Sequence, residues 1–239
     1  IAGAIESIPI VLNFEKSFKF QGKSSFLNFR GRVEIHQGQM VAVAGLLGCG
    51  KATLLRIIAG SVLPEDGTES QVFVPAHLIV ANVADDPLFL RGTLYSNLTF
   101  CMDTSQPSAS QERVKAICYQ LTQSATITDH LDHEDEMPWP ELFSGSQSKL
   151  LCVARALIHN PALLTIHKPL SRLTERDGLH VIEALHEHIK CRGLCLDGDS
   201  TGRRLRTVLA SAAGDKIAKA SHNVLQLDKE QGIKLRFLE

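Results

Sequence analysis

The sequence predicts an α/β protein with a mostly parallel sheet, because a phosphate-binding loop sits between a strand and a helix and further strands alternate with helices. The loop spans residues 45–51 (GLLGCGK). Apolar residues 41–44 predict a buried strand before it, and residues 54–60 predict a helix that stops at Gly60. Such a loop binds phosphate through backbone N–H groups, a lysine and the positive end of the helix.

The residues before the loop are rich in β-formers. Residues 9–14, 25–29 and 33–35 predict short strands, and residues 37–39 (QGQ) predict a turn into the strand that leads to the loop. We therefore expect an N-terminal antiparallel β subdomain ahead of the parallel sheet.

The rest of the chain alternates in character. Residues 78–83 predict a buried strand, and the helical pattern and polar loops from residue 93 onward predict an inserted helical subdomain over about 93–159. We expect a single domain over residues 1–239. Further elements are predicted as helices at 112–123, 148–159 and 174–190, and as strands at 162–166, 207–210 and 223–227.

Composition excludes several classes of protein. The net charge of -1 and the 5% aromatic content argue against a nucleic-acid partner.

The 6 cysteines are scattered without a C-x-x-C pair, which indicates reduced, mostly buried thiols in a cytosol-like compartment. No apolar run has the length of a membrane helix, and residues 1–5 lack the basic start of a signal peptide. The sequence begins with Ile1 and not with Met, so we expect a fragment or a processed chain.

One residue of the loop motif is altered. Ala52 follows Lys51, at the position where a serine or threonine hydroxyl would hold Mg²⁺. The phosphate cradle and the lysine are therefore present, and the metal ligand is missing.

Several motifs occur in a fixed order with this loop. They are residues 86–94 (DPLFLRGTL), residues 143–147 (FSGSQ), residues 154–157 (ARAL) and residues 160–166 (NPALLTI). Together they resemble the nucleotide-binding domain of ABC transporters over about residues 11–227. The segment from Pro87 to Leu98 is most similar to the exporter type, in the multidrug-resistance-associated and cystic-fibrosis-channel branch.

The resemblance implies two groups of nucleotide-contacting residues. The family signature is Leu-Ser-Gly-Gly-Gln, whose helix start holds the γ-phosphate of an ATP bound to an opposite domain. Ser144, Gly145 and Gln147 match it, whereas Phe143 and Ser146 depart from it, and an ordinary serine N-cap is the alternative interpretation. The expected signature residues are Ser144, Gly145, Ser146 and Gln147, and the expected own-site residues are Phe20, Gly45, Gly48, Cys49, Gly50, Lys51, Ala52 and Thr53. The resemblance implies an aromatic ring that stacks on adenine, for which Phe20 is expected and the nearby Phe18 is the alternative.

The resemblance fails at the residues that carry hydrolysis. The family's metal-binding aspartate and water-polarising glutamate align with His167 and Lys168, its metal-contacting glutamine with Asp85, and its γ-phosphate histidine with Ala212. The aspartate of the dimer-contact loop aligns with Thr174. We therefore expect no catalytic residues, no hydrolysis in the chain's own site and little or no Mg²⁺ binding, and we leave weak ATP binding open.

Two functions follow from this pattern. The first is a degenerate cassette domain at the cytosolic face of a membrane, or an equivalent reducing compartment. It would pair head-to-tail with a competent domain and contact a transmembrane domain near residues 85–91. The alternative is a pseudo-ATPase that serves as a structural or regulatory subunit without transport.

The remaining polar clusters have simpler interpretations. Residues 130–136 (HLDHEDE) lack the spacing of a metal site and are interpreted as a solvated acidic loop. His186 and His188 are interpreted as surface residues, and residues 203–206 (RRLR) as a solvated basic loop before a strand. His167 is interpreted as a histidine satisfied within the core at a strand end.

Overall fold

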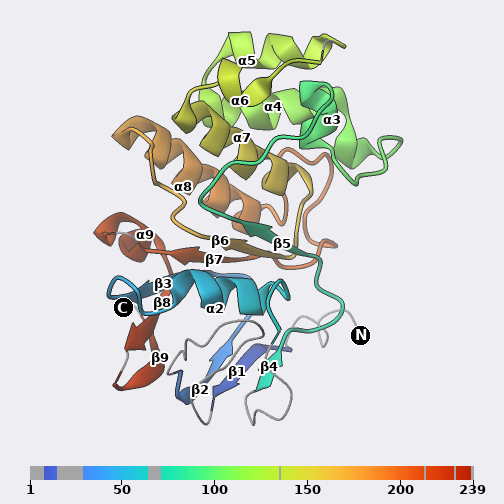
Figure 1. The fold of residues 1–239 in the computed structure, drawn as a ribbon. Coiled ribbons are helices and arrows are strands. Elements are labelled where there is room, and N and C mark those ends of the chain that lie inside the picture. The colour runs from blue at the N-terminus through green and yellow to red at the C-terminus, as the bar shows by residue number, and fades with distance from the viewer. Residues whose placement is uncertain are drawn as a thin grey trace. The chain divides into compact units, whose positions relative to one another are not determined.

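The chain forms two compact units in the computed structural model (Figure 1). The structure describes residues 8–14, 29–63, 71–134, 136–212, 214–228 and 230–237. Unit 1 comprises Ile1–Asn82, Ala162–Lys168 and Arg204–Glu239, and unit 2 comprises Val83–Pro161 and Pro169–Arg203. The predicted helical subdomain, residues 93–159, falls within unit 2. That residues 1–239 form a single domain stays a prediction.

A six-stranded, mostly parallel sheet forms the centre of unit 1, which confirms the predicted fold class. Its order is β5-β6-β7-β3-β8-β9, with β3 parallel to β7 and β8, β6 parallel to β7, and β9 antiparallel to β8. The strands are β3 (Met40–Gly45), β5 (Val80–Val83), β6 (Leu163–Ile166), β7 (Thr207–Ser211), β8 (Asn223–Asp228) and β9 (Gly232–Phe237).

A smaller antiparallel sheet confirms the predicted N-terminal β subdomain. Its order is β2-β1-β4, built from β1 (Ile10–Phe14), β2 (Gly31–Ile35) and β4 (Gln71–Phe73). Alternate residues of β1 are buried, as the period of a strand with one core face requires. The predicted strand at 25–29 lies mostly outside the described residues, and Phe29 itself packs on Phe14 with ring centroids 5.3 Å apart.

Helix α2 (Lys51–Ile58) packs against strands β3, β6 and β7. It begins three residues before the predicted start, because the loop leads directly into helical backbone at Lys51. Its apolar side, which includes Leu54 and Leu55, is buried in the core, and the chain leaves the helix at Gly60 with a positive φ of 72°. Helix α9 (Asp215–Ala220), which precedes β8, is not among the predicted elements.

Unit 2 is helical in the region where the sequence predicts helices. Helices α4, α7 and α8 contact one another (Figure 1). Its helices are α3 (Leu94–Leu98), α4 (Gln111–Thr122), α5 (Ala125–Asp129), α6 (Trp139–Leu142), α7 (Gly145–Ile158) and α8 (Glu175–Lys190), with short 3-10 turns η1 (Pro107–Ala109) and η2 (His130–Asp132). The predictions at 112–123 and 174–190 are confirmed within one or two residues, and α7 begins earlier than the predicted residue 148.

A buried arginine fastens α4 to the end of α7. The Arg113 guanidinium donates to the carbonyl oxygens of Leu157 (3.2 Å), Ile158 (2.8 Å) and Leu194 (3.0 Å). Leu157 and Ile158 lie in the last turn of α7, where helix carbonyls lack intrahelical donors and can accept from a side chain. Burial lowers the pKa of Arg113 to about 10, so the side chain remains charged at neutral pH.

Three sequence-based interpretations are wrong. His188 is fully buried, because it continues the apolar face of α8 that Val181, Ala184 and Leu185 form, and its Nε2 lies 3.1 Å from the Pro161 carbonyl oxygen. Arg206 is buried too, so the basic run is not a solvated loop throughout. Of the cysteines, Cys49 and Cys118 alone are buried, and all of them are free thiols.

No helix in the described part of the chain combines the length and the apolar character that a bilayer crossing requires.

Candidate functional site

The parallel strands of unit 1 end together at one edge of the sheet. In the order β6-β7-β3, the strands end at Ile166, Ser211 and Gly45. The residues that follow these ends therefore gather at the same edge, where open parallel sheets bind their ligands. The structure thus brings together the loop 45–51, the pair His167–Lys168 and the segment at Ala212, all within unit 1.

The glycines of the loop have positive φ angles, which residues with a side chain rarely adopt. Gly45, Gly48 and Gly50 have φ angles of 149°, 76° and 97°. A Cβ on Gly45 would lie 2.5 Å from the Leu227 carbonyl oxygen and 2.7 Å from Cys49 Sγ, whereas a Cβ on Gly48 would meet nothing within 4 Å. Gly45 is therefore required by close packing as well as by φ, and Gly48 by φ alone.

Lys51 lies folded over this loop. Its ammonium donates to the carbonyl oxygens of Gly45 (2.6 Å) and Leu46 (2.9 Å), and its Nζ lies 3.8 Å from Cys49 Sγ. Helix α2 starts here with Gly50 as its N-cap, without a side-chain cap or an acidic residue in its first turn. The lysine charge and the first N–H groups of α2 make this loop a site for an anion.

The other residues predicted for the nucleotide site add no charge. Ala52 and Thr53 are half-buried in the first turn of α2, and the Ala52 side chain carries no oxygen. Cys49 is buried beneath the loop. Phe20, the predicted adenine contact, lies outside the described residues.

Ser211 connects the two residues that follow β6. The backbone N–H of Lys168 donates to Ser211 Oγ (2.6 Å), and the same oxygen lies 3.0 Å from His167 Nδ1. The direction of the second hydrogen bond depends on the imidazole tautomer. Lys168 has a φ of 48°, a left-handed conformation that costs a residue with a side chain free energy.

Sequence reasoning missed Ser211 as a member of this site. The parallel register of β6 and β7 pairs Ile166 with Ala210, so the residue after Ala210 faces the residues after Ile166. A polar residue at the end of a strand predicted next to residues 162–166 is the signal that could have identified it. His167 does contact this hydroxyl at the end of β6, but it is half-buried, so its interpretation as a core histidine is wrong in that respect.

The predicted signature residues form the start of α7 in unit 2. Ser144 is the N-cap, and its Oγ accepts from the Gln147 backbone N–H (3.2 Å) while the Gln147 side-chain oxygen accepts from the Ser144 N–H (2.9 Å). This capping box explains the early start of α7. Ser146 Oγ lies 3.1 Å from Ser144 Oγ, and Ser144 and Gly145 are exposed.

Two further predicted positions also belong to unit 2. Asp85 accepts a hydrogen bond from Ser171 Oγ (2.6 Å) on its Oδ1. Thr174 is the N-cap of α8, and its Oγ1 accepts from the Asp177 backbone N–H (3.2 Å). Each of these side chains therefore has a structural role inside its own unit.

Comparison with known proteins identifies the family. A family model described as "ABC transporter" matches residues 30–171, which is more than half of the chain. The bicarbonate transport ATP-binding protein CmpC of Synechococcus elongatus is 32% identical over 168 residues, which cover 68% of this chain and 25% of that protein.

Other relatives show the same partial coverage. The aliphatic sulfonates import ATP-binding protein SsuB of Yersinia pestis is 31% identical over 59% of this chain and 49% of its own length. The multidrug resistance protein homolog 65 of Drosophila melanogaster is 27% identical over 70% of this chain and 13% of its own length. The chain thus spans half or less of each of these relatives.

Proposed function

The chain belongs to the ABC transporter family, and we propose that it is an ATP-binding-cassette domain that binds nucleotide weakly and does not hydrolyse it in its own site. The observation that carries the proposal is the edge of the sheet in unit 1. There an anion-binding loop stands beside His167 and Lys168, which Ser211 holds in place. The cradle for phosphate is kept, and the oxygen ligands for a metal are replaced.

The residues of this edge do not fit Mg²⁺. This ion takes oxygen ligands in a nearly octahedral arrangement, usually from carboxylates, hydroxyls and phosphates. Ala52, His167 and Lys168 supply a methyl group, an imidazole and an ammonium instead. The Asp85 carboxylate belongs to unit 2, where it accepts from Ser171. No hydrolytic step is therefore derived through a metal.

The same residues do fit a polyphosphate. The Lys51 ammonium donates to two carbonyl oxygens of its own loop and lies near a thiol, whereas a phosphate offers it a full opposite charge. The first N–H groups of α2 point toward the same anion. The triphosphate of ATP therefore supplies the contacts in this proposal, with Phe20 as the proposed adenine contact.

Hydrolysis requires more than this cradle. Positioned groups that stabilise the transition state typically contribute about 10²-fold or more each. The proposed degenerate positions Asp85, His167, Lys168 and Ala212 replace several such groups at once. Turnover in this site is then expected to be at the level of the background.

The proposed role of unit 2 is to contact a second cassette. Ser144 and Gly145 are exposed at the N-terminus of α7, so this turn is accessible to the γ-phosphate of an ATP bound by a competent partner in a head-to-tail dimer. A transmembrane domain would complete the assembly at the cytosolic face. The exporter-type assignment rests on residues 87–98.

Calorimetry tests the proposed nucleotide site. ATP should bind the wild-type chain equally well with Mg²⁺ or with a chelator, and Lys51→Ala should abolish this binding. Lys219→Ala, which removes an exposed lysine of α9 in the same unit, is the matched control and should bind as the wild type does. Robust Mg²⁺-dependent turnover by the wild-type chain would overturn the proposal.

A restoration variant tests the reason for the loss. Ala52→Ser combined with His167→Asp and Lys168→Glu returns three oxygen-bearing side chains to the sheet edge. We expect ATP binding to become dependent on Mg²⁺, because the new oxygens attract the cation and the new carboxylates repel the bare phosphate. Binding that stays independent of Mg²⁺ would show that these positions do not determine metal use.

One observation favours the alternative of a structural or regulatory subunit. The Ser144 hydroxyl and the Gln147 side chain complete a capping box inside α7, so the turn is satisfied without a phosphate. Ser144→Arg in the purified whole assembly separates the two functions. Loss of ATP turnover supports the contact with a partner's ATP, and unchanged turnover supports the subunit without transport.

A further inference from the structure

Unit 2 contains a fully buried lysine that the proposed function does not use. The Lys149 side chain on α7 has 0% exposure. Its ammonium donates to the carbonyl oxygens of Ala84 (2.9 Å) and Asp85 (3.3 Å) and lies 3.6 Å from Asp85 Oδ1. A buried ammonium is stable only with such partners, so α7 and residues 84–85 depend on each other.

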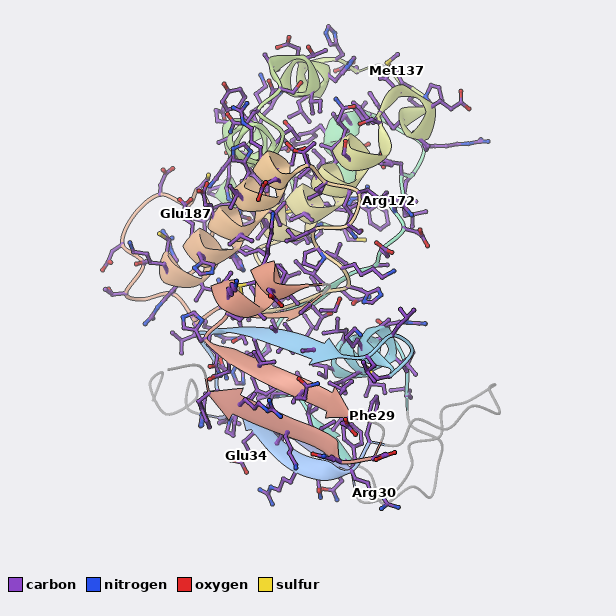
Figure 2. The ribbon with its side chains drawn as sticks, turned by 90° about the vertical axis from the view of Figure 1, so that its left-hand side faces the viewer. Phe29, Arg30, Glu34, Met137, Arg172 and Glu187 are labelled. Atoms are coloured by element: carbon purple, nitrogen blue, oxygen red, sulfur yellow. The ribbon has the colours of Figure 1, made fainter. Side chains whose placement is uncertain are left out.

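Asp85 contacts the loop before α8 as well as Lys149. Its Oδ1 accepts from Ser171 Oγ (2.6 Å), and the neighbouring Asp86 pairs with the guanidinium of Arg172 at 3.1 Å. Figure 2 labels Arg172 on this loop. The Asp86–Arg172 pair is exposed and contributes little, whereas the contacts of Asp85 include a buried cation.

A second arginine contact holds the same segment further along α7. The Arg155 guanidinium donates to the carbonyl oxygens of Leu88 (2.8 Å) and Asn97 (2.7 Å). Asn97 in turn accepts from the Leu90 N–H (2.7 Å) and donates to the Leu90 carbonyl oxygen (3.0 Å). Lys149 and Arg155 are about 9 Å apart along the helix axis, at 1.5 Å per residue. Helix α7 therefore contacts residues 84–90 through two separate side chains, Lys149 and Arg155.

We propose that Lys149 and Asp85 form a positioning pair that joins residues 84–90 to the first turns of α7, so that a displacement of the segment moves Ser144 and Gly145 with it. The segment carries the exposed side chains of Leu88 and Leu90, and the α7 start carries the exposed signature turn. The roles of the two surfaces, toward a membrane domain and toward a partner's ATP, rest on the proposed function. The link itself rests on contacts within unit 2.

Amide hydrogen exchange of the whole chain, measured by NMR, tests the link. The reporters are the Leu90 N–H, bonded to Asn97 Oδ1, and the Ser148 N–H, bonded to the Ser144 carbonyl oxygen at 2.9 Å. Asp85→Asn keeps the size of the side chain and removes the Asp85 carboxylate charge that faces the buried ammonium. We expect both reporters to exchange about tenfold faster or more, together, while amides of β3 and β7 in unit 1 keep their rates.

Two further variants make the result specific. Lys115→Met removes the exposed ion pair between Lys115 and Asp132 in the same unit and should change neither reporter by more than about twofold. Asp85→Glu retains the carboxylate and should return both reporters toward wild-type rates. If Asp85→Asn accelerates only one reporter, or Asp85→Glu accelerates both as strongly as Asn does, the positioning pair is refuted.

The experiment is independent of the proposed function, because it contains no nucleotide and no partner. Absence of ATP binding in calorimetry would overturn the proposed nucleotide site and leave the exchange result unaffected. If Asp85→Asn prevents folding, Lys149→Met replaces the charge by an apolar side chain of similar length. In that variant the Ser148 and Leu90 amides should both exchange faster than in the wild type, and unchanged rates in both would refute the link.

Discussion

Replacing Ser211 by alanine tests whether its hydroxyl holds the sheet edge of unit 1. The Ser211 side chain is 1% exposed, and its Oγ accepts from the Lys168 N–H at 2.6 Å. The alanine variant leaves this donor without its acceptor, which costs about 1–3 kcal/mol of stability. The variant also removes one hydrogen bond that offsets the cost of the left-handed backbone at Lys168. We take about 2 kcal/mol as the expected loss, which corresponds to about 6 °C in the apparent Tm of a chain of this size.

Thermal and urea denaturation, followed by circular dichroism, measure this loss. Ser61→Ala is the control, because Ser61 is exposed in the same unit and water can take the place of its hydroxyl. We expect the control to change stability by less than about 0.5 kcal/mol. A Ser211→Ala variant as stable as the control would refute the view that this hydroxyl fixes His167 and Lys168.

Three further predictions concern the same unit and the thiols. Lys168→Gly should stabilise the chain by about 1 kcal/mol in urea denaturation, because glycine adopts a φ of 48° without the cost of a side chain; a loss of stability would show that the lysine side chain contributes packing that outweighs the strain. Gly45→Ala should destabilise the chain more than Gly48→Ala does, since only the first places a Cβ 2.5 Å from a carbonyl oxygen; equal losses in paired thermal melts would argue against the packed loop. Burial raises the pKa of Cys118 to about 12. Because this folded pKa lies above that of an unfolded thiol, its contribution to stability is complete below about pH 8.5 and is lost as the pH rises from there through about 12. In alkylation with mass-spectrometric readout at pH 8, exposed Cys101 should react in the folded chain and Cys118 only after unfolding; equal labelling would refute the burial of Cys118.

Much of the fold could be predicted because its signals are local in sequence. The strand–loop–helix at residues 40–58 depends on an apolar run and on glycines, and both can be recognised without tertiary contacts. The start of α7 lies earlier than helix propensity predicts, because Gly145 and Ser146 are poor helix formers and the capping box that begins the helix overrides their propensity. The burial of His188 follows from its place on the apolar face of α8, which the two-residue spacing of His186 and His188 does not reveal.

The polar contacts of the site could not be predicted in the same way, because they depend on strand register and on side-chain packing. Ser211 meets Lys168 only through the parallel pairing of β6 and β7. Asp85 meets Lys149 only because α7 folds back on residues 84–90. In the sequence these pairs are 43 and 64 residues apart. Sequence comparison with the family pattern can show that such positions differ, and it cannot show what they contact.

These contacts bear on how the altered positions arose. His167 and Lys168 share the hydroxyl of Ser211, and Asp85 is paired with Lys149 and Ser171, in each case inside one unit. Loss of function without selection tends to leave buried polar groups without partners, since each new residue is accepted without regard to its neighbours. Here two of the positions proposed to be degenerate, His167 and Asp85, carry side chains that contact polar neighbours in their own unit. This matching favours a chain that has been kept for a structural and nucleotide-dependent role over one in which the former site simply decays, and the calorimetric and hydrogen-exchange experiments measure the two parts of that role separately.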